Sequence, residues 1–299
     1  MKIAVGSSSF AASSDEAINI MLNKGIEVVK NPYGRKLTED ETIEHLKGAD
    51  GLLAGLEPLT ERVFENSPQL KAVARIGIGM DSVDVEAAKR HGIKVSNTPD
   101  APTEAVAEMA LAALLTIGHE IIPSNRDVHN KIWKKRIGFS LPGLNVLIIG
   151  YSRIGRKFAE HLSTFGSNII IYDPYQPEIS EPDLKSALAK ADVVSVHASG
   201  AQEILSAEAF EYMNDGVVLM NCSRGPLINE DALYEAIKSG KVSCFWGDVF
   251  WQEPYEGRLL ELDNAILTPH ISTYNKRCRK SMETEAVLNL MGDLGIEVE

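Results

Sequence analysis

Short runs of β-branched and apolar residues alternate with longer amphipathic stretches through almost the whole sequence. In the first hundred residues these runs are Lys2–Gly6, Glu27–Lys30, Gly51–Ala54, Lys71–Ile76 and Lys94–Ser96. A second series follows at Asn145–Gly150, Asn168–Asp173, Asp192–His197, Gly216–Cys222, Val242–Val249 and Ala265–Thr268. Apolar strands that alternate with helices are typical of parallel sheets covered by helices on both faces. The sequence therefore predicts an α/β protein with two doubly wound parallel sheets.

The length of the chain agrees with two domains, because 299 residues correspond to two units of about 150 residues each. Between the two series of runs, Pro102–His119 has the pattern of a long, mostly apolar helix with a proline in its first turn. A last amphipathic helix, from Lys276 to Met291, is expected to cross back to the first domain. We therefore predict a discontinuous first domain of residues 1–98 and 271–299, and a second domain of residues 99–270.

Composition excludes several classes of partner. With 30 Lys and Arg against 42 Asp and Glu, the net charge is −12, which does not suit a nucleic-acid partner. The longest uncharged apolar stretch, Met109–Gly118, is too short to cross a bilayer, so no membrane partner is expected. The N-terminus runs into a strand without a signal-peptide pattern, which indicates a cytoplasmic protein. The three cysteines, Cys222, Cys244 and Cys278, include no Cys-x-x-Cys pair, so we expect reduced thiols and no metal site.

A glycine-containing loop follows the first strand of the second series. The strand Val146–Ile149 leads into Gly150-Tyr151-Ser152-Arg153-Ile154-Gly155 and then into a helix expected at Arg156–Phe165. This is the layout of a dinucleotide-binding loop, G-x-G-x-x-G, with Ser152 in place of the middle glycine. Gly150 would form the tight turn and Gly155 would let the helix pack close to the strand. The helix N-terminus would bind the pyrophosphate, and the Ser152 hydroxyl can bond a phosphate oxygen.

The next strand ends in a carboxylate, Asp173, at the place where such folds bind the adenosine ribose hydroxyls. A carboxylate there repels a 2′-phosphate, so NAD is favoured over NADP as cofactor. The alternative interpretation is a structural turn, with Asp173 simply ending its strand before Pro174. Strand, loop, helix and carboxylate together favour the cofactor site.

Three later segments carry reactive side chains at the ends of predicted strands, where ligands of open α/β sheets bind. Hydride transfer between a secondary alcohol and a nicotinamide needs a group that moves the hydroxyl proton, and His270 suits that role. Glu253 would orient the imidazole and favour its charged form. Arg224 would hold a substrate carboxylate and polarise the adjacent carbonyl. The alternative is that all three are surface groups. His197 also ends a strand and is interpreted as a residue that lines the site or supports a lining residue, without a catalytic role.

Together these segments resemble the D-isomer-specific 2-hydroxyacid dehydrogenases, the family of phosphoglycerate dehydrogenase, glyoxylate/hydroxypyruvate reductase and formate dehydrogenase. The resemblance covers nearly the whole chain. Besides the cofactor loop, it is carried by Asn221–Gly225, Gly247–Pro254, Thr268–His270, Arg75–Asp84, Asn97–Pro99 and Ala105–Glu108.

The resemblance implies a Rossmann NAD-binding domain and a flavodoxin-like substrate domain. It implies that Arg75 and the backbone N–H groups around Ile78 and Gly79 bind the substrate carboxylate, and that Arg224, Glu253 and His270 are catalytic. The residues it places in contact with NAD are Arg153, Ile154, Asp173, Cys222, Ser223 and Asp248, the last at the nicotinamide carboxamide. It also implies a homodimer built largely on the Pro102–His119 helix.

The chain departs from the family pattern at several positions. Pro102 stands where many members carry an Asn that reaches the active site, and the segment Ala198–Glu203 is shorter than usual and lacks a common proline. Because the sequence stops at Glu299, no regulatory domain and no feedback control by serine are expected.

We therefore expect an NAD-dependent D-2-hydroxyacid dehydrogenase that resembles phosphoglycerate dehydrogenase and acts on a small anionic acid. Lys134, Lys135 and Arg136 are a candidate phosphate patch, although such a run can equally be a solvated loop. A glyoxylate/hydroxypyruvate reductase is the alternative within the family. The alternative of another class is a non-catalytic NAD-sensing interaction protein, but the retention of Arg224, Glu253 and His270 together argues against it.

Overall fold

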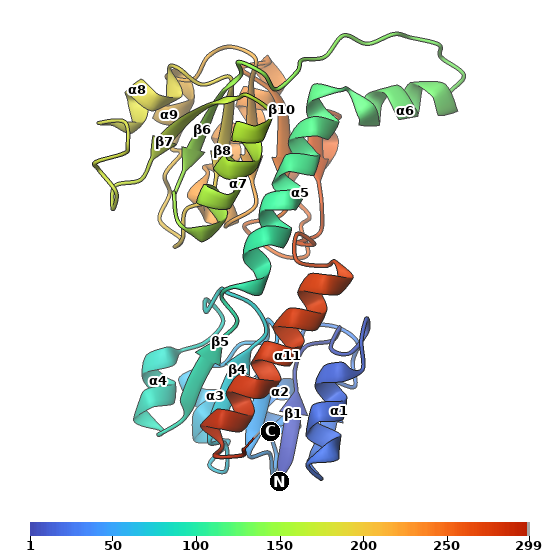
Figure 1. Ribbon diagram of the computed structural model, residues 1–299, viewed down its shortest axis with the longest axis vertical. Helices are drawn as coiled ribbons and strands as arrows, with labels where there is room; N and C mark the ends of the chain where they lie inside the picture. The colour runs from blue at the N-terminus through green and yellow to red at the C-terminus, as the bar shows by residue number, and fades with distance from the viewer. Residues whose placement is uncertain (298–299) are drawn as a thin grey trace. The chain divides into compact units, whose positions relative to one another are not determined.

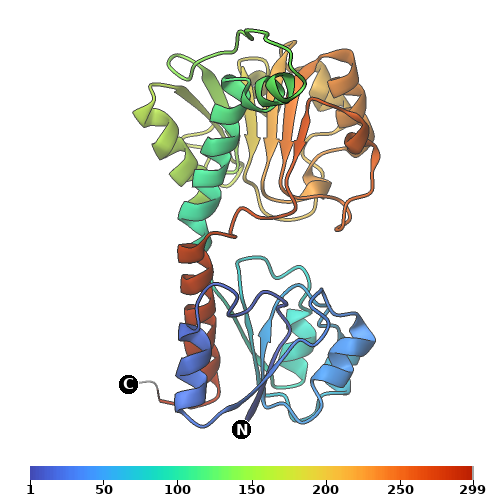
Figure 2. The same cartoon turned by 90° about the vertical axis from the view of Figure 1, so that its right-hand side faces the viewer.

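The computed structural model describes residues 1–297, which divide into two compact units. Unit 1 consists of Met1–Pro102 and the C-terminal segment that begins at Thr273, and unit 2 consists of Thr103–Ser272. Each unit is built on a parallel sheet with helices on both faces (Figures 1 and 2). The predicted α/β class with two doubly wound parallel sheets is confirmed.

Unit 1 holds a five-stranded parallel sheet in the order β2-β1-β3-β4-β5. Its strands are β1 (Lys2–Val5), β2 (Glu27–Lys30), β3 (Gly51–Ala54), β4 (Ala72–Arg75) and β5 (Lys94–Asn97). The central strand β3 is buried at every residue, because helices cover both faces. The strand order is the flavodoxin-like one, in which the direction of chain progression reverses beside β1. Ligands of such sheets bind outside the carboxyl ends of the strands near that point.

Helices pack on both faces of this sheet. On one face, α1 (Glu16–Asn23) and α11 (Lys276–Asp293) lie side by side, and α11 also contacts β3, β4 and β5 (Figure 2). On the other face lie α2 (Glu39–His45), α3 (Glu61–Glu65) and α4 (Val85–Arg90). The buried positions of α11 recur at helical spacing, and they include Met282, Ala286 and Leu290.

Side-chain caps set the start of several unit 1 helices. Thr38 accepts a hydrogen bond from Glu41 N–H, and the Glu41 side chain accepts one from Thr38 N–H, which completes a capping box on α2. Asp84 caps α4 and Asn275 caps α11 in the same manner, each through the N–H three residues ahead.

Unit 2 holds a six-stranded parallel sheet in the order β11-β10-β9-β8-β6-β7. Its strands are β6 (Asn145–Ile149), β7 (Asn168–Tyr172), β8 (Val193–Val196), β9 (Val217–Asn221), β10 (Val242–Gly247) and β11 (Ala265–Leu267). All six lie inside the predicted runs. The direction of chain progression reverses beside β6, which pairs with β7 on one side and β8 on the other.

Two apolar layers enclose this sheet. On one face, α5 (Ala101–Gly118) and α7 (Arg153–Thr164) pack against Val146 and Ile148 of β6. On the other face, α8 (Leu184–Leu188), α9 (Ala207–Glu211) and α10 (Glu230–Ser239) pack against Leu147 and Ile149. Successive side chains of one strand thus enter opposite layers. The remaining helical segments are α6 (Ile121–His129) and the short 3-10 helices η1 (Gly225–Leu227) and η2 (Arg258–Glu261).

Among the described residues, α5 alone is long and apolar enough to cross a membrane by length and composition. The sequence analysis counted only the uncharged stretch Met109–Gly118, whereas α5 also spans Glu104 and Glu108; the expectation of no membrane partner stays a prediction. Half of the helix is buried, with Ala107, Ala110 and Leu114 in the apolar layer of unit 2. The core helix of a soluble protein passes the same test, so the finding is weak evidence for a membrane span.

Candidate active site

The loops that leave the carboxyl ends of the unit 2 strands carry most of the predicted site residues. Gly150 follows β6, Asp173 follows β7, and Cys222, Ser223 and Arg224 follow β9. Asp248 and Glu253 follow β10, and His270 follows β11. Parallel strands bring these loops to one edge of the sheet, next to the reversal of chain progression at β6, which is where such folds bind ligands.

Two glycines of the cofactor loop are required by the geometry. Gly150 has a φ of +90°, and a Cβ at this position would lie 2.5 Å from the Ala198 backbone nitrogen. Gly155 lies in the first turn of α7, where a Cβ would be 2.1 Å from the Gly150 carbonyl oxygen. A side chain at either position would push strand, loop and helix apart. This close approach is what a dinucleotide-binding loop needs.

The helix α7 begins at Arg153, three residues before the predicted start at Arg156. The predicted start was wrong because the last glycine belongs to the first turn and does not precede it. The N–H groups of Arg153, Ile154 and Gly155 therefore lie in a helical turn that has no intrahelical acceptors for them. Ser152 is the N-cap, and its exposed hydroxyl caps no N–H group within residues 1–297. Such a helix start fits a pyrophosphate.

Asp173 follows β7 and is 7% exposed. Its Oδ2 accepts hydrogen bonds from Tyr151 N–H at 2.8 Å and from Gln176 Nε2 at 3.0 Å, and its Oδ1 accepts one from Tyr175 N–H at 3.0 Å. A carboxylate has about four acceptor positions, so three donors leave one for a ribose hydroxyl. The bond to Tyr151 also ties the cofactor loop to β7. The loop, the helix start and Asp173 therefore fit NAD.

Cys222 and Ser223 lie at the end of β9 beside the buried imidazole of His197. Ser223 donates to Asn221 Oδ1 through its N–H at 3.0 Å and its hydroxyl at 3.2 Å. Cys222 Sγ is 3.5 Å from His197 Nδ1, and His197 Nε2 is 2.8 Å from Ser195 Oγ. Burial lowers the pKa of His197 to about 3 and raises the pKa of the Cys222 thiol. Both groups are therefore neutral at pH 7.

Arg224 has extended backbone, with φ −145° and ψ 136°, directly before η1. Its side chain is half-buried, and Nη1 donates to the Ser223 carbonyl at 2.6 Å. The Arg224 carbonyl in turn accepts a hydrogen bond of 2.8 Å from Asn221 Nδ2. The next residue, Gly225, packs so closely on the loop after β10 that a Cβ would lie 2.2 Å from the Phe250 carbonyl carbon. Arg224 is thus held next to the loop that carries Glu253.

Glu253 and His270 form a hydrogen-bonded pair, with 2.9 Å between Glu253 Oε2 and His270 Nδ1. Glu253 Oε1 accepts a second bond, of 3.2 Å, from Phe250 N–H. Partial burial raises the pKa of Glu253, but the hydrogen bond and charge of His270, with smaller effects of Phe250 N–H and the Arg224 charge, outweigh burial and hold the pKa below its ordinary value. The ionised carboxylate orients the imidazole through Nδ1, so Nε2 is the nitrogen that can reach a substrate.

Asp248 lies directly after β10 and is fully buried. Its Oδ1 accepts hydrogen bonds from Thr268 Oγ1 at 2.6 Å and from Ile271 N–H at 2.9 Å. Its Oδ2 accepts bonds from Ser272 N–H at 2.9 Å and from the Ser272 hydroxyl. In the structure, the Asp248 carboxylate binds the segment that carries His270; its contact with the nicotinamide carboxamide, which the resemblance implies, stays a prediction. The sequence analysis missed Thr268 and Ser272 as its partners.

In unit 1, the predicted substrate loop follows β4. Gly77 has a φ of +135° and donates through its N–H to Thr98 Oγ1 at 2.7 Å. Asn97 Nδ2 donates to the Ile78 carbonyl at 2.8 Å. These bonds fix the loop to the end of β5, whereas the N–H groups of Ile78 and Gly79 form no hydrogen bond within the described chain. The loop can therefore offer two N–H groups to an anion.

A buried carboxyl group that the sequence analysis missed lies next to this loop. Glu57 follows β3, is 1% exposed, and accepts the Gly55 N–H with both oxygens at 3.0 Å. Burial raises the pKa of Glu57, and the positive charge of Arg75 opposes that rise. The Arg75 guanidinium folds over Gly77 and donates to the Ile76 carbonyl. A glutamate in the loop that leaves the carboxyl end of a buried strand is the signal that could have identified Glu57.

One cation of the candidate phosphate patch, Arg136, is paired with carboxylates of unit 2. Arg136 Nε is 2.8 Å from Asp127 Oδ2, and Arg136 Nη1 is 3.6 Å from Glu120 Oε2. The side-chain hydrogen bond to Asp127 raises the pKa of Arg136, and the same bond lowers the pKa of Asp127.

Among the described residues, no group of three or more His, Cys, Asp or Glu side chains could hold a metal ion.

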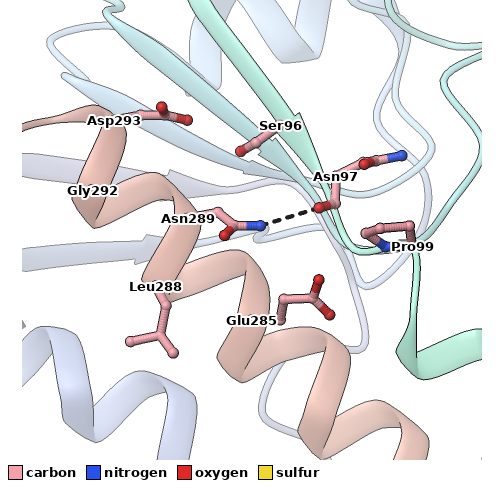
Figure 3. A pocket seen from close by; sticks show the side chains of 8 residues that line it. All are labelled: Ser96, Asn97, Pro99, Glu285, Leu288, Asn289, Gly292 and Asp293. Atoms are coloured by element: carbon pink, nitrogen blue, oxygen red, sulfur yellow. Dashed lines mark hydrogen bonds between the residues drawn. The ribbon is translucent and has the colours of Figure 1, made fainter.

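A shallow pocket of unit 1 holds none of the predicted site residues. It lies between the end of β5 and α11, where Asn289 Nδ2 donates to the Asn97 carbonyl at 3.1 Å (Figure 3). Glu285 and Asp293 line it from α11, and burial, with the nearby charge of Asp100, raises the pKa of Glu285. An acidic lining does not suit an anionic substrate, so the pocket is not a candidate active site.

Known proteins of one family match this chain. The model of the "D-isomer specific 2-hydroxyacid dehydrogenase, NAD binding domain" family matches residues 111–272. The hydroxypyruvate reductase of Thermotoga maritima is 34% identical over 295 residues, which cover 94% of this chain and 95% of that protein. The D-3-phosphoglycerate dehydrogenase of Methanocaldococcus jannaschii is 36% identical over 287 residues, which cover 90% of this chain but 54% of that protein. The chain thus spans about half the length of the second relative.

Among solved structures, the TT0316 protein from Thermus thermophilus superimposes with a TM-score of 0.89 at 30% identity, covering 99% of this chain and 98% of that one. Fold, site and these matches define an NAD-dependent oxidoreductase. The chain belongs to the family of D-isomer-specific 2-hydroxyacid dehydrogenases. The resemblance inferred from the sequence and the expected cofactor, NAD, are both confirmed. The interpretation as a non-catalytic sensor is wrong.

Proposed function

We propose that the chain catalyses the NADH-dependent reduction of a small, unphosphorylated 2-oxo acid, such as hydroxypyruvate or glyoxylate, to the D-2-hydroxy acid. The observation that supports this most directly is the Glu253–His270 pair, at 2.9 Å, in a loop cluster that also holds Arg224. These residues supply a proton donor, a carboxylate that orients it and a cation for the substrate carboxylate.

Bound NADH supplies the hydride to C2 of the substrate. His270 Nε2 donates the proton to the carbonyl oxygen, and Glu253 keeps the imidazole oriented and stabilises its charged form through Nδ1. Arg224 binds the substrate carboxylate and polarises the adjacent carbonyl. Ile78 and Gly79, through their N–H groups, and Arg75 are further candidates for the carboxylate. The candidates for binding NAD are Gly150, Ser152, Arg153, Ile154, Gly155 and Asp173, together with Cys222, Ser223 and Asp248.

An unphosphorylated substrate is favoured by the charges near these residues. A phosphate group carries about two negative charges at pH 7 and is usually bound by a cluster of Arg and Lys side chains. In unit 1, the cation of the substrate loop, Arg75, lies close enough to the carboxyl group of Glu57 to affect its pKa. In unit 2, Arg136 of the basic run is paired with Asp127. The relative matched over nearly its whole length is also named for an unphosphorylated acid.

The test is NADH oxidation by the purified protein with hydroxypyruvate, glyoxylate, pyruvate and phosphohydroxypyruvate, each repeated with NADPH. We expect kcat/KM for hydroxypyruvate or glyoxylate to exceed that for phosphohydroxypyruvate by at least about 100-fold, since an uncompensated phosphate is poorly bound. A preference for phosphohydroxypyruvate would contradict the proposed substrate class. No turnover of any of these acids, despite NADH binding, would contradict the proposed reaction.

We also propose a homodimer. The support is a set of exposed apolar side chains on α6 and the segment after it, namely Ile121, Ile122, Val128, Ile132, Trp133 and Ile137. Such a surface is typical of a protein interface. Light scattering of the wild type and of Trp133→Glu tests this, and a monomeric wild type would contradict it.

A cytoplasmic location is proposed as well, because Cys222, Cys244 and Cys278 are free thiols. Cell fractionation tests it.

A further inference from the structure

Glu57 is a buried carboxyl group of unit 1 that the proposed reaction does not use. We propose that Glu57 is a specificity-determining residue, whose carboxyl group fills the place at the end of the unit 1 sheet where a phosphate would bind and thereby excludes phosphorylated acids. This inference rests on the proposed function, because it explains how the chain selects an unphosphorylated 2-oxo acid.

The first observation is where Glu57 lies in the sheet. Strands β1 and β3 are neighbours, and the direction of chain progression reverses beside β1. In flavodoxin-like sheets, the point between the ends of these two strands is where a phosphorylated ligand such as FMN binds. Glu57 follows β3 and accepts the Gly55 N–H with both carboxyl oxygens at 3.0 Å. Its carboxyl group therefore takes up a backbone donor at this point.

The second observation is that two glycines make room for the carboxyl group. A Cβ at Gly6, directly after β1, would lie 1.8 Å from Glu57 Oε1. A Cβ at Gly55, directly after β3, would lie 3.0 Å from Glu57 Oε2 and 3.2 Å from the Ser7 backbone nitrogen. The Glu57 side chain thus fills the space between the loops after β1 and β3 that side chains at the two glycines would need. A second anion cannot occupy the same space.

The third observation is that the surroundings of this carboxyl group suit an anion. The positive charges of Arg75, at the end of β4, and Lys36, in the loop after β2, oppose the rise in the pKa of Glu57 that burial causes. In the loop after β1, the N–H groups of Ser7–Ser9 form no hydrogen bond within residues 1–297. Cations and backbone N–H groups of this kind are what phosphate sites use. Glu57 is the group that makes the place unsuitable for a phosphate.

A phosphate at this end of the sheet would have to displace or protonate Glu57. The residue is 1% exposed, so water screens its charge only weakly, and two anions in such surroundings repel each other strongly. Moving the carboxyl group aside would also break its bonds to the Gly55 N–H. Hydroxypyruvate and glyoxylate carry no second anionic group and do not meet this cost. Selection by excluding the competitor needs no added contact to the preferred substrate.

The test measures NADH oxidation with hydroxypyruvate and with phosphohydroxypyruvate for the wild type, Glu57→Ser and Glu57→Gln. Glu57→Ser removes the charge and opens the space, whereas Glu57→Gln removes the charge alone. We expect the ratio of kcat/KM for phosphohydroxypyruvate to that for hydroxypyruvate to rise by at least about 10-fold in Glu57→Ser, and by a smaller factor in Glu57→Gln. A general loss of structure lowers both values and leaves their ratio, so the ratio reports on selection.

Asp50→Asn is the matched control. Asp50 directly precedes β3, at the opposite end of the same strand, and its Oδ2 also accepts a backbone N–H, from Lys2 at 3.0 Å. The substitution removes one negative charge from unit 1 and should leave the ratio within about 3-fold of the wild type. A rise as large as in Glu57→Ser would overturn the inference, because the net charge of unit 1 would then set the ratio.

A binding measurement separates this inference from the proposed reaction. Calorimetric titration of the NAD-saturated protein compares 3-phosphoglycerate with D-glycerate, the products of the two substrates. In Glu57→Ser, 3-phosphoglycerate should bind at least about 10-fold more tightly than in the wild type, while the dissociation constant of D-glycerate changes by less than about 3-fold. A wild type that turns over no 2-oxo acid would refute the proposed function, and this titration would still test Glu57.

The outcomes are therefore distinct. A wild type that prefers phosphohydroxypyruvate would contradict the proposed substrate class. In an enzyme that prefers hydroxypyruvate, a substrate ratio within about 3-fold of the wild type in both Glu57 variants, with unchanged binding of 3-phosphoglycerate, would overturn the inference alone. If Glu57→Ser does not fold, Glu57→Gln decides by the same two readouts.

Discussion

His197 is buried in unit 2 as a neutral imidazole, so acidification should destabilise the fold at this residue. The residue is 5% exposed, its ring centroid lies 5.1 Å from that of Phe158, and burial lowers its pKa to about 3. The unfolded chain binds the proton near the ordinary histidine pKa of about 6.5. The contribution of His197 to stability is therefore complete above about pH 6.5 and is lost as the pH falls toward 3.

The magnitude follows from the difference between the two pKa values. A shift of about 3.5 units at about 1.4 kcal/mol per unit corresponds to about 5 kcal/mol when the loss is complete. By pH 5 the loss amounts to about 2 kcal/mol. For a unit of this size, about 2 kcal/mol lowers the melting temperature by about 4 to 8 °C.

The assay is thermal and urea unfolding at pH 7.5 and pH 5.0 for the wild type, His197→Gln and His129→Gln. His197→Gln removes the titrating group, so its loss of stability between the two pH values should be about 2 kcal/mol smaller than that of the wild type. His129 is exposed on α6, and His129→Gln should behave as the wild type does. Parallel pH dependence in His197→Gln and the wild type would refute the assignment of a neutral, buried His197.

Three further predictions concern the cofactor loop and the catalytic pair. Asp173→Ser should lower the preference for NADH over NADPH by at least about 10-fold, because it removes the charge that repels a 2′-phosphate; an unchanged ratio of kcat/KM values would argue against this role. Gly150→Ala should weaken NADH binding and should destabilise unit 2 more than the control Gly216→Ala does. Both glycines have positive φ, but only the Cβ at Gly150 would meet another atom. Equal effects of the two substitutions in calorimetry and in NADH titration would contradict the close approach at Gly150. Glu253→Gln should lower kcat by about 10- to 100-fold and leave the NADH dissociation constant nearly unchanged, because the imidazole loses the carboxylate that orients it through Nδ1; an unchanged kcat would count against the pair.

The strands could be anticipated well, because each is a continuous apolar run separated from the next by a helical pattern. All six strands of unit 2 lie inside the predicted runs, and the long helix predicted at Pro102–His119 is α5 (Ala101–Gly118). The start of α7 was misplaced, because sequence alone does not tell whether the last glycine of the loop precedes the helix or lies in its first turn. The structure decides this through the contact of Gly155 with the Gly150 carbonyl.

The side-chain partners within the site were harder to predict. Glu253 and His270 were expected to act together, and the structure gives the distance and the ring nitrogen involved. The hydrogen bonds from Thr268 and Ser272 to the Asp248 carboxylate could not be inferred. A carboxylate after a strand gives the same sequence pattern whether it faces a ligand or a neighbouring loop. Glu57 was missed for the same reason, since its burial depends on packing between separate strand ends.

The most direct test of the central claim is to measure kcat and the NADH dissociation constant for His270→Gln. If His270 donates the proton to the substrate, kcat for hydroxypyruvate should fall by about 100- to 10,000-fold, while NADH binds with nearly unchanged affinity. A His270→Gln enzyme that keeps a rate close to that of the wild type would contradict the assignment of His270, and with it the account of the Glu253–His270 pair.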